Sequence, residues 1–243
     1  MRTLLRGGQI LDGAGAPAYR GDVRLNGDKI EAVGALSPLP DEQVIDVSGC
    51  VVCPAFVDMH RHMDARPLLG DDMAVELRQG IATTAVGNCG FSLAPYGGAF
   101  AAEKRENDAP ILGRYPESFR FQFPEYLNAL EHSAPGMNLA ALIGLGAVRI
   151  SLTGFSDAPL SSSALNAARG MLQDALDAGA AGISAGIMYL PEYYTTRDEY
   201  RAMLAPLRGT GKPLVTHIRG EGDGLVASVR EVIEIAREAE CPL

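Results

Sequence analysis

Residues 55–62, Ala-Phe-Val-Asp-Met-His-Arg-His, are the stretch that decides the fold of this chain. A short apolar run begins the stretch, and two histidines two positions apart end it, which is typical of a buried strand with polar groups at its carboxyl end. Side chains at i and i+2 of an extended segment lie on one face, so the imidazoles of His60 and His62 are predicted to lie together. The pair indicates a metal site, although two histidines on a solvated strand end are also common without a metal.

Downstream of this stretch, strand-like apolar runs alternate with helical stretches. Including the first, we expect strands at 55–58, 82–87, 139–143, 182–185 and 213–216. Two helices are expected from apolar residues at helical spacing: Leu165, Ala168, Leu172 and Leu176 in the first, and Val226, Val229, Ile233 and Ala236 in the second. Alternation of strands and helices predicts right-handed βαβ units, a parallel sheet, and ligands at the carboxyl ends of its strands.

Two other regions have a different texture. Residues 1–54 contain short alternating segments, and Asn26-Gly27 between two of them predicts a β-hairpin, because type I′ turns need positive φ at both central residues. This region is therefore expected to be a small β domain. Residues 95–117 carry glycines, prolines and mixed charge without clear periodicity. This predicts an inserted loop on the active-site face of the sheet, where it is expected to act as a lid.

Composition excludes several classes of function. The 243 residues include 21 Lys and Arg against 30 Asp and Glu, a net charge of −9, and no basic cluster, so a nucleic-acid partner is not expected. No apolar run approaches the roughly 18 residues of a membrane helix, and the first residues do not resemble a signal peptide. The four cysteines are too few for a disulfide scaffold, which indicates the cytoplasm.

Two further residues are candidates for metal binding. Cys89 follows the second expected strand, and His217 ends the fifth, so both lie at the level of the first histidine pair. A thiolate and an imidazole suit zinc. Taken alone, however, a free thiol such as Cys89 is more often a buried, inert cysteine, and His217 is equally well a hydrogen-bonded core histidine. Cys50 and Cys53 have the spacing of a zinc knuckle without a second pair, so we interpret them as packing residues.

The chain resembles the N-terminal portion of the amidohydrolase superfamily, specifically the N-acyl-D-amino-acid deacylase (D-aminoacylase) family. Four pieces carry the resemblance: Pro54 to His62, Gly87-Asn88-Cys89-Gly90 running to Pro95, Gly182 to Gly186 running to Tyr189, and Thr216 to Arg219. The Asn-Cys-Gly piece discriminates this family, because dihydroorotases, hydantoinases and many deaminases share the histidine pair.

The resemblance implies an α/β fold: a metal-dependent hydrolase (β/α)₈ TIM-like barrel, of which about five of eight strands are present, beside a small β-sandwich built from both chain ends. We expect residues 1–54 to form the N-terminal part of the sandwich and residues 55–243 the incomplete barrel. It further implies that the metal residues are His60, His62, Cys89 and His217, with Cys89 and His217 holding the tighter ion. Tyr189 matches a substrate-contacting tyrosine of the family.

The sequence departs from the family pattern in several places. Ala55 stands where the family usually has glycine, and Leu145 replaces a histidine, which is expected to alter the pocket. The sixth-strand histidine and the eighth-strand aspartate, the general base, have no counterpart before residue 243. We therefore expect a fragment or a split gene product whose partners are a missing C-terminal half or further copies of itself.

The expected activity is that of a zinc-dependent hydrolase of linear carbon–nitrogen amide bonds other than peptide bonds, deacylating N-acyl-D-amino acids with one or two Zn²⁺ ions and a metal-activated water. One alternative is a cyclic amidase like dihydroorotase or hydantoinase. Those enzymes typically use a carboxylated lysine, whereas Lys212 lies at the wrong end of its strand. The other alternative is a non-catalytic barrel fragment that acts as an assembly partner.

Overall fold

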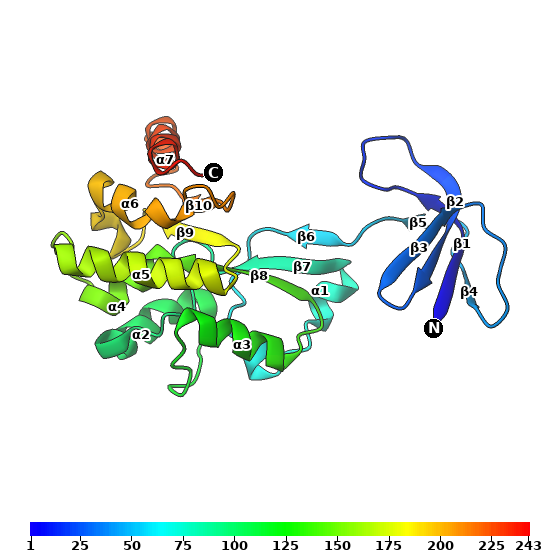
Figure 1. Ribbon diagram of the computed structural model, residues 1–243, viewed down its shortest axis with the longest axis horizontal. Helices are drawn as coiled ribbons and strands as arrows, with labels where there is room; N and C mark the ends of the chain where they lie inside the picture. Colours follow the sequence, from blue (N-terminus) through cyan, green and yellow to red (C-terminus); the bar gives the residue numbers. More distant parts are fainter. The chain divides into compact units, whose positions relative to one another are not determined.

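A computed structural model describes residues 1–243. The chain divides into two compact units, Met1–Phe56 and Val57–Leu243, which are described separately (Figure 1). None of the helices combines the length and the apolar composition needed to cross a lipid bilayer.

The first unit is a five-stranded mixed sheet. Its strands are β1 (Arg2–Ile10), β2 (Tyr19–Asn26), β3 (Lys29–Gly34), β4 (Gln43–Asp46) and β5 (Val51–Val52). The first three form an antiparallel meander, and β4 and β5 each pair with β1 in parallel. Leu4, Ile10 and Val23 are its buried apolar side chains.

Two details of this unit differ from the expectations. The register pairs Asn26 with Lys29, so the hairpin loop consists of Gly27 and Asp28 rather than Asn26 and Gly27, and only Gly27 has positive φ (+62°). Cys50 and Cys53 are free and exposed, so their interpretation as packing residues is wrong. They lie beside the two-residue strand β5, which is too short to bury its neighbours.

The second unit contains a five-stranded sheet in the order β10-β9-β8-β7-β6, which confirms the predicted α/β half-barrel. Its strands are β6 (Phe56–Asp58), β7 (Ile81–Val86), β8 (Asn138–Gly144), β9 (Gly182–Gly186) and β10 (Leu214–His217). The pairs β7–β8, β8–β9 and β9–β10 are parallel. All five strands begin and end within two residues of the predicted bounds because each is a short apolar run between turn residues.

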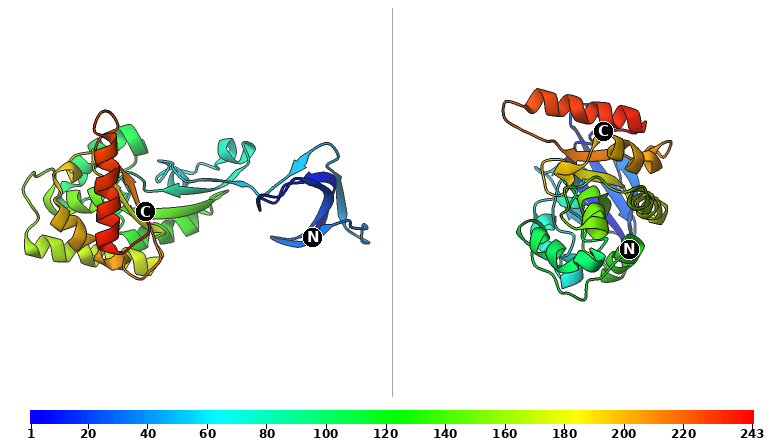
Figure 2. Two further views of the ribbon diagram at one scale, coloured as in Figure 1. Left: turned by 90° about the horizontal axis from the view of Figure 1, so that it is seen from above. Right: turned by 90° about the vertical axis from the view of Figure 1, so that its left-hand side faces the viewer.

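Helices accompany this sheet (Figures 1 and 2). They are α1 (Ala74–Arg78), α2 (Ala101–Leu112), α3 (Phe123–Ser133), α4 (Leu145–Thr153), α5 (Ser162–Ala178), α6 (Arg197–Met203) and α7 (Leu225–Ala239). Single 3₁₀ turns lie at Pro67–Leu69, Gly98–Phe100, Glu192–Tyr194 and Ala205–Leu207. In α5 the Ser161 hydroxyl accepts the Ala164 N–H as an N-cap, and Gly179 ends the helix with φ +114°.

The prediction of a loop throughout residues 95–117 is wrong, whereas the second predicted helix is confirmed as α7, with an inward face that its apolar spacing did not identify. Residues 101–112 of the expected lid loop form α2, which escapes detection because its inward face is the charged pair Lys104 and Asp108, both almost fully buried. In α7 the apolar residues Val226, Val229 and Ile233 are exposed, and the inward face consists of Ser228, Val232, Ile235, Ala236 and Ala239. Because α7 carries apolar residues on both its exposed and its buried face, the sequence does not show which face meets the core.

Candidate metal centre

The predicted donors meet at the carboxyl ends of the strands. His60 and His62 follow β6, Cys89 follows β7, and His217 is the last residue of β10. Tyr189 lies three residues beyond the end of β9. Parallel strands bring their carboxyl ends to one edge, so residues far apart in sequence become neighbours there.

The loop that carries Cys89 is built on close backbone packing. Gly87 and Gly90 have left-handed φ (+77° and +74°), and Cys89 between them has φ +58°, which is uncommon for a residue with a side chain. A Cβ added at Gly87 would lie 2.1 Å from the Leu142 carbonyl oxygen, and one added at Gly186 would lie 2.0 Å from the Cys89 carbonyl oxygen. The glycines therefore let this loop press directly on the ends of β8 and β9.

Buried polar side chains hold the same loop in place. The Ser184 hydroxyl accepts the Gly90 N–H at 3.1 Å and donates to the Gly87 carbonyl oxygen. The Asn88 amide is fully buried and donates to the Arg61 carbonyl oxygen at 3.3 Å, which connects the cysteine loop to the histidine turn. These contacts fix the position of Cys89 relative to the strand ends.

Cys89 is the common member of the donor set. The ligand atoms of His60, His62 and Cys89 all lie within 4.8 Å of one another. The Cys89 Sγ is 3.2 Å from the His60 Nε2 and 3.8 Å from the His217 Nδ1. The structure therefore brings together both predicted histidines and the cysteine, and His217 approaches the same sulfur without belonging to that mutual group.

His217 is shared between the cysteine and two other groups. Its Nδ1 also lies 3.3 Å from the Tyr189 hydroxyl, and its Nε2 lies 3.4 Å from a Glu221 carboxylate oxygen. The Tyr189 ring packs edge-on against His217 and against Phe91, with ring centroids 4.9 and 5.0 Å apart. Tyr189 thus borders the donors with its hydroxyl directed at them.

Burial sets the protonation of the donors. Burial, with smaller contributions from the nearby Glu192 and Glu221, raises the pKa of the Cys89 thiol to about 11. Burial also lowers the pKa of His62, as do the adjacent His60 and His217, and the buried His62 Nδ1 has no hydrogen-bond partner. Near neutral pH the site therefore presents a thiol and a neutral imidazole, and a cation that binds there displaces the thiol proton.

This donor set fits a soft or borderline cation. Imidazole nitrogen and thiolate sulfur are the ligands that zinc takes in proteins, whereas magnesium and calcium take oxygen. The buried, unpartnered His62 nitrogen is the structural observation that favours a bound group at this position.

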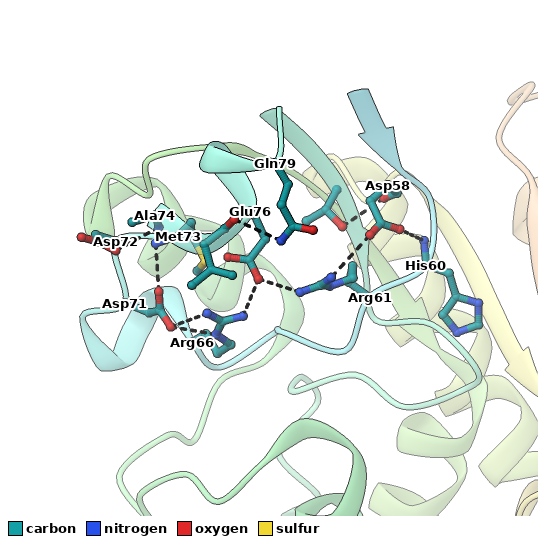
Figure 3. A network of polar contacts seen from close by, with 12 residues as sticks. Asp58, His60, Arg61, Arg66, Asp71, Asp72, Met73, Ala74, Glu76 and Gln79 are labelled. Carbon is teal, nitrogen blue, oxygen red and sulfur yellow. Dashed lines mark hydrogen bonds and ion pairs between the residues drawn. The ribbon is translucent and has the colours of Figure 1, made fainter. Parts of the chain in front are cut away.

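The histidine turn is backed by a network of ion pairs. Figure 3 shows Arg61, between the two histidines, directed away from the His60 ring and toward Glu76 of α1. Asp58 accepts the His60 N–H at 3.1 Å, and Arg66 and Asp71 complete the network.

Several residues that shape the site were missed by sequence reasoning. Glu192 is buried, and its carboxylate accepts the Gly186 N–H at 2.9 Å and the Tyr200 hydroxyl at 3.0 Å. Glu76 and Ser184 are likewise buried. A single acidic or hydroxyl residue in sequence carries no sign of its burial. Leu145, expected to alter the pocket, is instead fully buried in the hydrophobic core.

Comparisons with known proteins agree on one family. Residues 43–243 match the family described as "Amidohydrolase family". The chain is 35% identical to a D-aminoacylase of Alcaligenes xylosoxydans xylosoxydans over 99% of its own length and 49% of that relative. It therefore spans about half the length of the curated relatives it matches.

Two solved structures are similar in fold. A crystal structure of D-aminoacylase superposes with a TM-score of 0.90 at 36% identity, covering 99% of this chain and 50% of the other. An N-acyl-D-glutamate deacylase from Bordetella bronchiseptica, solved with zinc and a phosphonate inhibitor, has a TM-score of 0.85 at 34% identity, covering 98% of this chain and 49% of the other.

Proposed function

Since this chain belongs to the amidohydrolase family, we propose that its activity is the zinc-dependent hydrolysis of linear amides, in which the acyl group is removed from an N-acyl-D-amino acid. The observation that carries the proposal is the cluster of His60, His62 and Cys89, whose ligand atoms lie within 4.8 Å of one another. The likeness to D-aminoacylase and to a zinc-containing deacylase supports both the metal and the substrate class.

Each residue near the cluster has a role in this proposal. Cys89, His60 and His62 hold one ion, and His217, whose Nδ1 lies 3.8 Å from the Cys89 sulfur, is a ligand to the same ion or to a second one. Zinc, when bound, supplies a Lewis acid and lowers the pKa of a coordinated water to about 7. Tyr189 binds substrate, since its hydroxyl faces the donors from a ring fixed by Phe91.

The cyclic amidase alternative requires a lysine that can be carboxylated near the metal residues, and neither Lys104 nor Lys212 is placed for this role. Lys212 precedes β10, and its ammonium group donates to the Leu176 carbonyl oxygen at 2.9 Å, at the opposite end of the strand from His217. Lys104 is committed to Asp108 and to the Ser92 carbonyl oxygen. Neither lysine is free to carry a bridging carboxylate between metals.

Organisation and location follow as further parts of the proposal. We propose that residues 1–54 are a separate small β domain beside an amidohydrolase barrel beginning at residue 55, a division close to the change of unit after Phe56. The four free cysteines support a reducing cytoplasmic location. The partners we propose are the N-acyl amino acid substrate and a C-terminal half or further copies of this chain.

The test is an assay of N-acetyl-D-amino acids beside their L forms, with and without a chelator. We expect this chain, assayed together with the proposed C-terminal half, to hydrolyse the D form in a reaction that a chelator abolishes and zinc restores. His217→Ala should lower kcat/KM by more than the roughly 10- to 100-fold typical of outer-shell changes. His132→Ala is the matched control, because His132 is exposed on α3 and should retain full activity. Equal rates for the L form, or chelator-resistant turnover, would refute the proposal.

A further inference from the structure

Arg61 places a permanent cation between the two histidines of the cluster. Its guanidinium is directed away from the His60 ring, since neighbouring residues of an extended segment point to opposite sides (Figure 3). The Nη2 atom lies 2.6 Å from the Glu76 Oε1, and the Nη1 atom lies 3.6 Å from the Asp58 Oδ2. The Arg61 side chain is one-third exposed, so it has room to move if these contacts are lost.

Glu76 is fixed more firmly than its partner. Its side chain is 2% exposed and belongs to α1, and its Oε1 also contacts the Arg66 Nη1 at 2.8 Å. Arg66 is held in turn by Asp71 at 2.6 Å. Glu76 is therefore a buried anchor with two cationic partners, of which only Arg61 belongs to the histidine turn.

The shape of the turn does not depend on the guanidinium. The Arg61 N–H donates to the Ala85 carbonyl oxygen at 3.2 Å, and the Arg61 carbonyl oxygen accepts from the Asn88 amide. Asp58 accepts the His60 N–H. These backbone contacts hold the turn, which leaves the ion pair with Glu76 to determine where the positive charge lies.

We propose that Glu76 is a positioning residue that holds the Arg61 guanidinium out of the metal pocket, so that the turn presents only its imidazoles. The inference rests on the proposed function, because it concerns a cation at His60, His62 and Cys89. A released guanidinium would repel a divalent cation nearby. Changes to residues that orient ligands typically weaken metal binding by about 10- to 100-fold, and we expect this loss in Glu76→Gln.

The experiment is a titration of metal-free protein with Co²⁺, read by its visible d–d and thiolate-to-cobalt charge-transfer absorbance. Glu76→Gln should bind Co²⁺ about 10- to 100-fold more weakly than the wild type. Arg61→Met, alone or combined with Glu76→Gln, should bind within about 3-fold of the wild type, because no cation remains to be released. Arg66→Met is the matched control: it removes the other partner of Glu76 and should leave Co²⁺ affinity unchanged.

The results that would contradict this inference differ from the result that would contradict the proposed function. If Glu76→Gln binds Co²⁺ as tightly as the wild type, or if the double variant stays as weak as Glu76→Gln, the inference is wrong and Glu76 only supports α1. Should Glu76→Gln fail to fold, Arg61→Met still decides, because a tenfold loss there identifies the guanidinium as a required tether. A wild type that binds no Co²⁺ contradicts the proposed function, and this inference with it.

Discussion

Glu192 shows how one buried carboxyl group couples the site to pH. Burial raises its pKa to about 7, against the smaller opposing effects of the Gly186 N–H, the Tyr200 hydroxyl, the Gly146 N–H and Arg149. An unfolded glutamate titrates near pH 4.3. Between these values the folded protein retains a proton that the unfolded chain has lost, so the free energy of unfolding falls as pH rises through this window.

Glu192→Gln should flatten this fall. The group contributes up to about 1.4 kcal/mol per pH unit across the window, roughly 4 kcal/mol in all, and a neutral amide contributes none of it. Urea unfolding between pH 4.5 and 7.5 measures the two slopes. The buried Asp64, whose pKa burial also raises to about 7, remains in both proteins and cancels in the comparison. An identical slope in the variant would contradict the assignment.

Single residues also mark the limit of sequence reasoning about the site. The histidine pair, Cys89 and His217 could be selected because rare, metal-binding residue types end the first, second and fifth predicted strands. The distances among them could not be predicted, because Cys89 adopts a left-handed backbone and its sulfur lies within 3.8 Å of both His60 and His217. Glu192 and Glu76 could not be selected either, since their roles arise from burial alone.

At the scale of elements, the strand ends meet the cysteine loop through backbone contacts that only glycine permits. Gly186→Ala would place a methyl group 2.0 Å from the Cys89 carbonyl oxygen, which must displace the loop, and we expect a loss of about 1–3 kcal/mol in the free energy of unfolding.

Gly170 provides the matched control for this substitution. It lies exposed within α5, and an added Cβ would meet nothing within 4 Å, so Gly170→Ala should stabilise the protein by about 0.5–1 kcal/mol. Urea denaturation of both variants measures the two changes. A neutral Gly186→Ala would show that the loop does not press on β9.

The helix α2 has a buried ion pair as its inward contact. The Lys104 Nζ lies 2.5 Å from the Asp108 Oδ2, donates to the Ser92 carbonyl oxygen, and is fully buried. Lys104→Met leaves the Asp108 carboxylate with only the Tyr115 hydroxyl as a donor, so the free energy of unfolding should fall by about 3–5 kcal/mol.

The adjacent Arg105→Met is the control for Lys104→Met. It removes the exposed pair with Glu117 and should cost no more than about 1 kcal/mol. Chemical denaturation of the two variants gives the comparison, and equal losses would mean that the buried pair contributes no more than a surface one.

Elements with one uniform apolar inward face were predictable from sequence, whereas the inward faces of mixed elements were not. The helix α5 and the strands β8 and β9 bury apolar residues, although β6 leaves Phe56 and Val57 exposed. By contrast, α2 buries charges, and α7 has apolar residues on both its inner and outer faces. Periodicity identifies α7 as a helix but cannot decide which of two apolar stripes meets the core.

At the scale of the whole molecule, the change in sequence pattern near residue 55 reflects a change in architecture. The mixed sheet of the first unit gives way to parallel strands and helices after Phe56, two residues beyond the boundary expected from sequence at 54. The parallel sheet of the half-barrel could be predicted from the alternation of strands and helices in the sequence. The neighbours of each donor depended on side-chain packing, which alternation does not encode.

The central claim, that the strand ends bind zinc through His60, His62 and Cys89, is tested most directly by the zinc content of the purified protein. Elemental analysis should find at least one zinc ion per chain in the wild type and in Cys241→Ala, whose partly buried thiol lies away from the cluster. Cys89→Ala and His62→Ala should lose that zinc. A zinc-free wild type, or a zinc content unchanged in both cluster variants, would contradict the account.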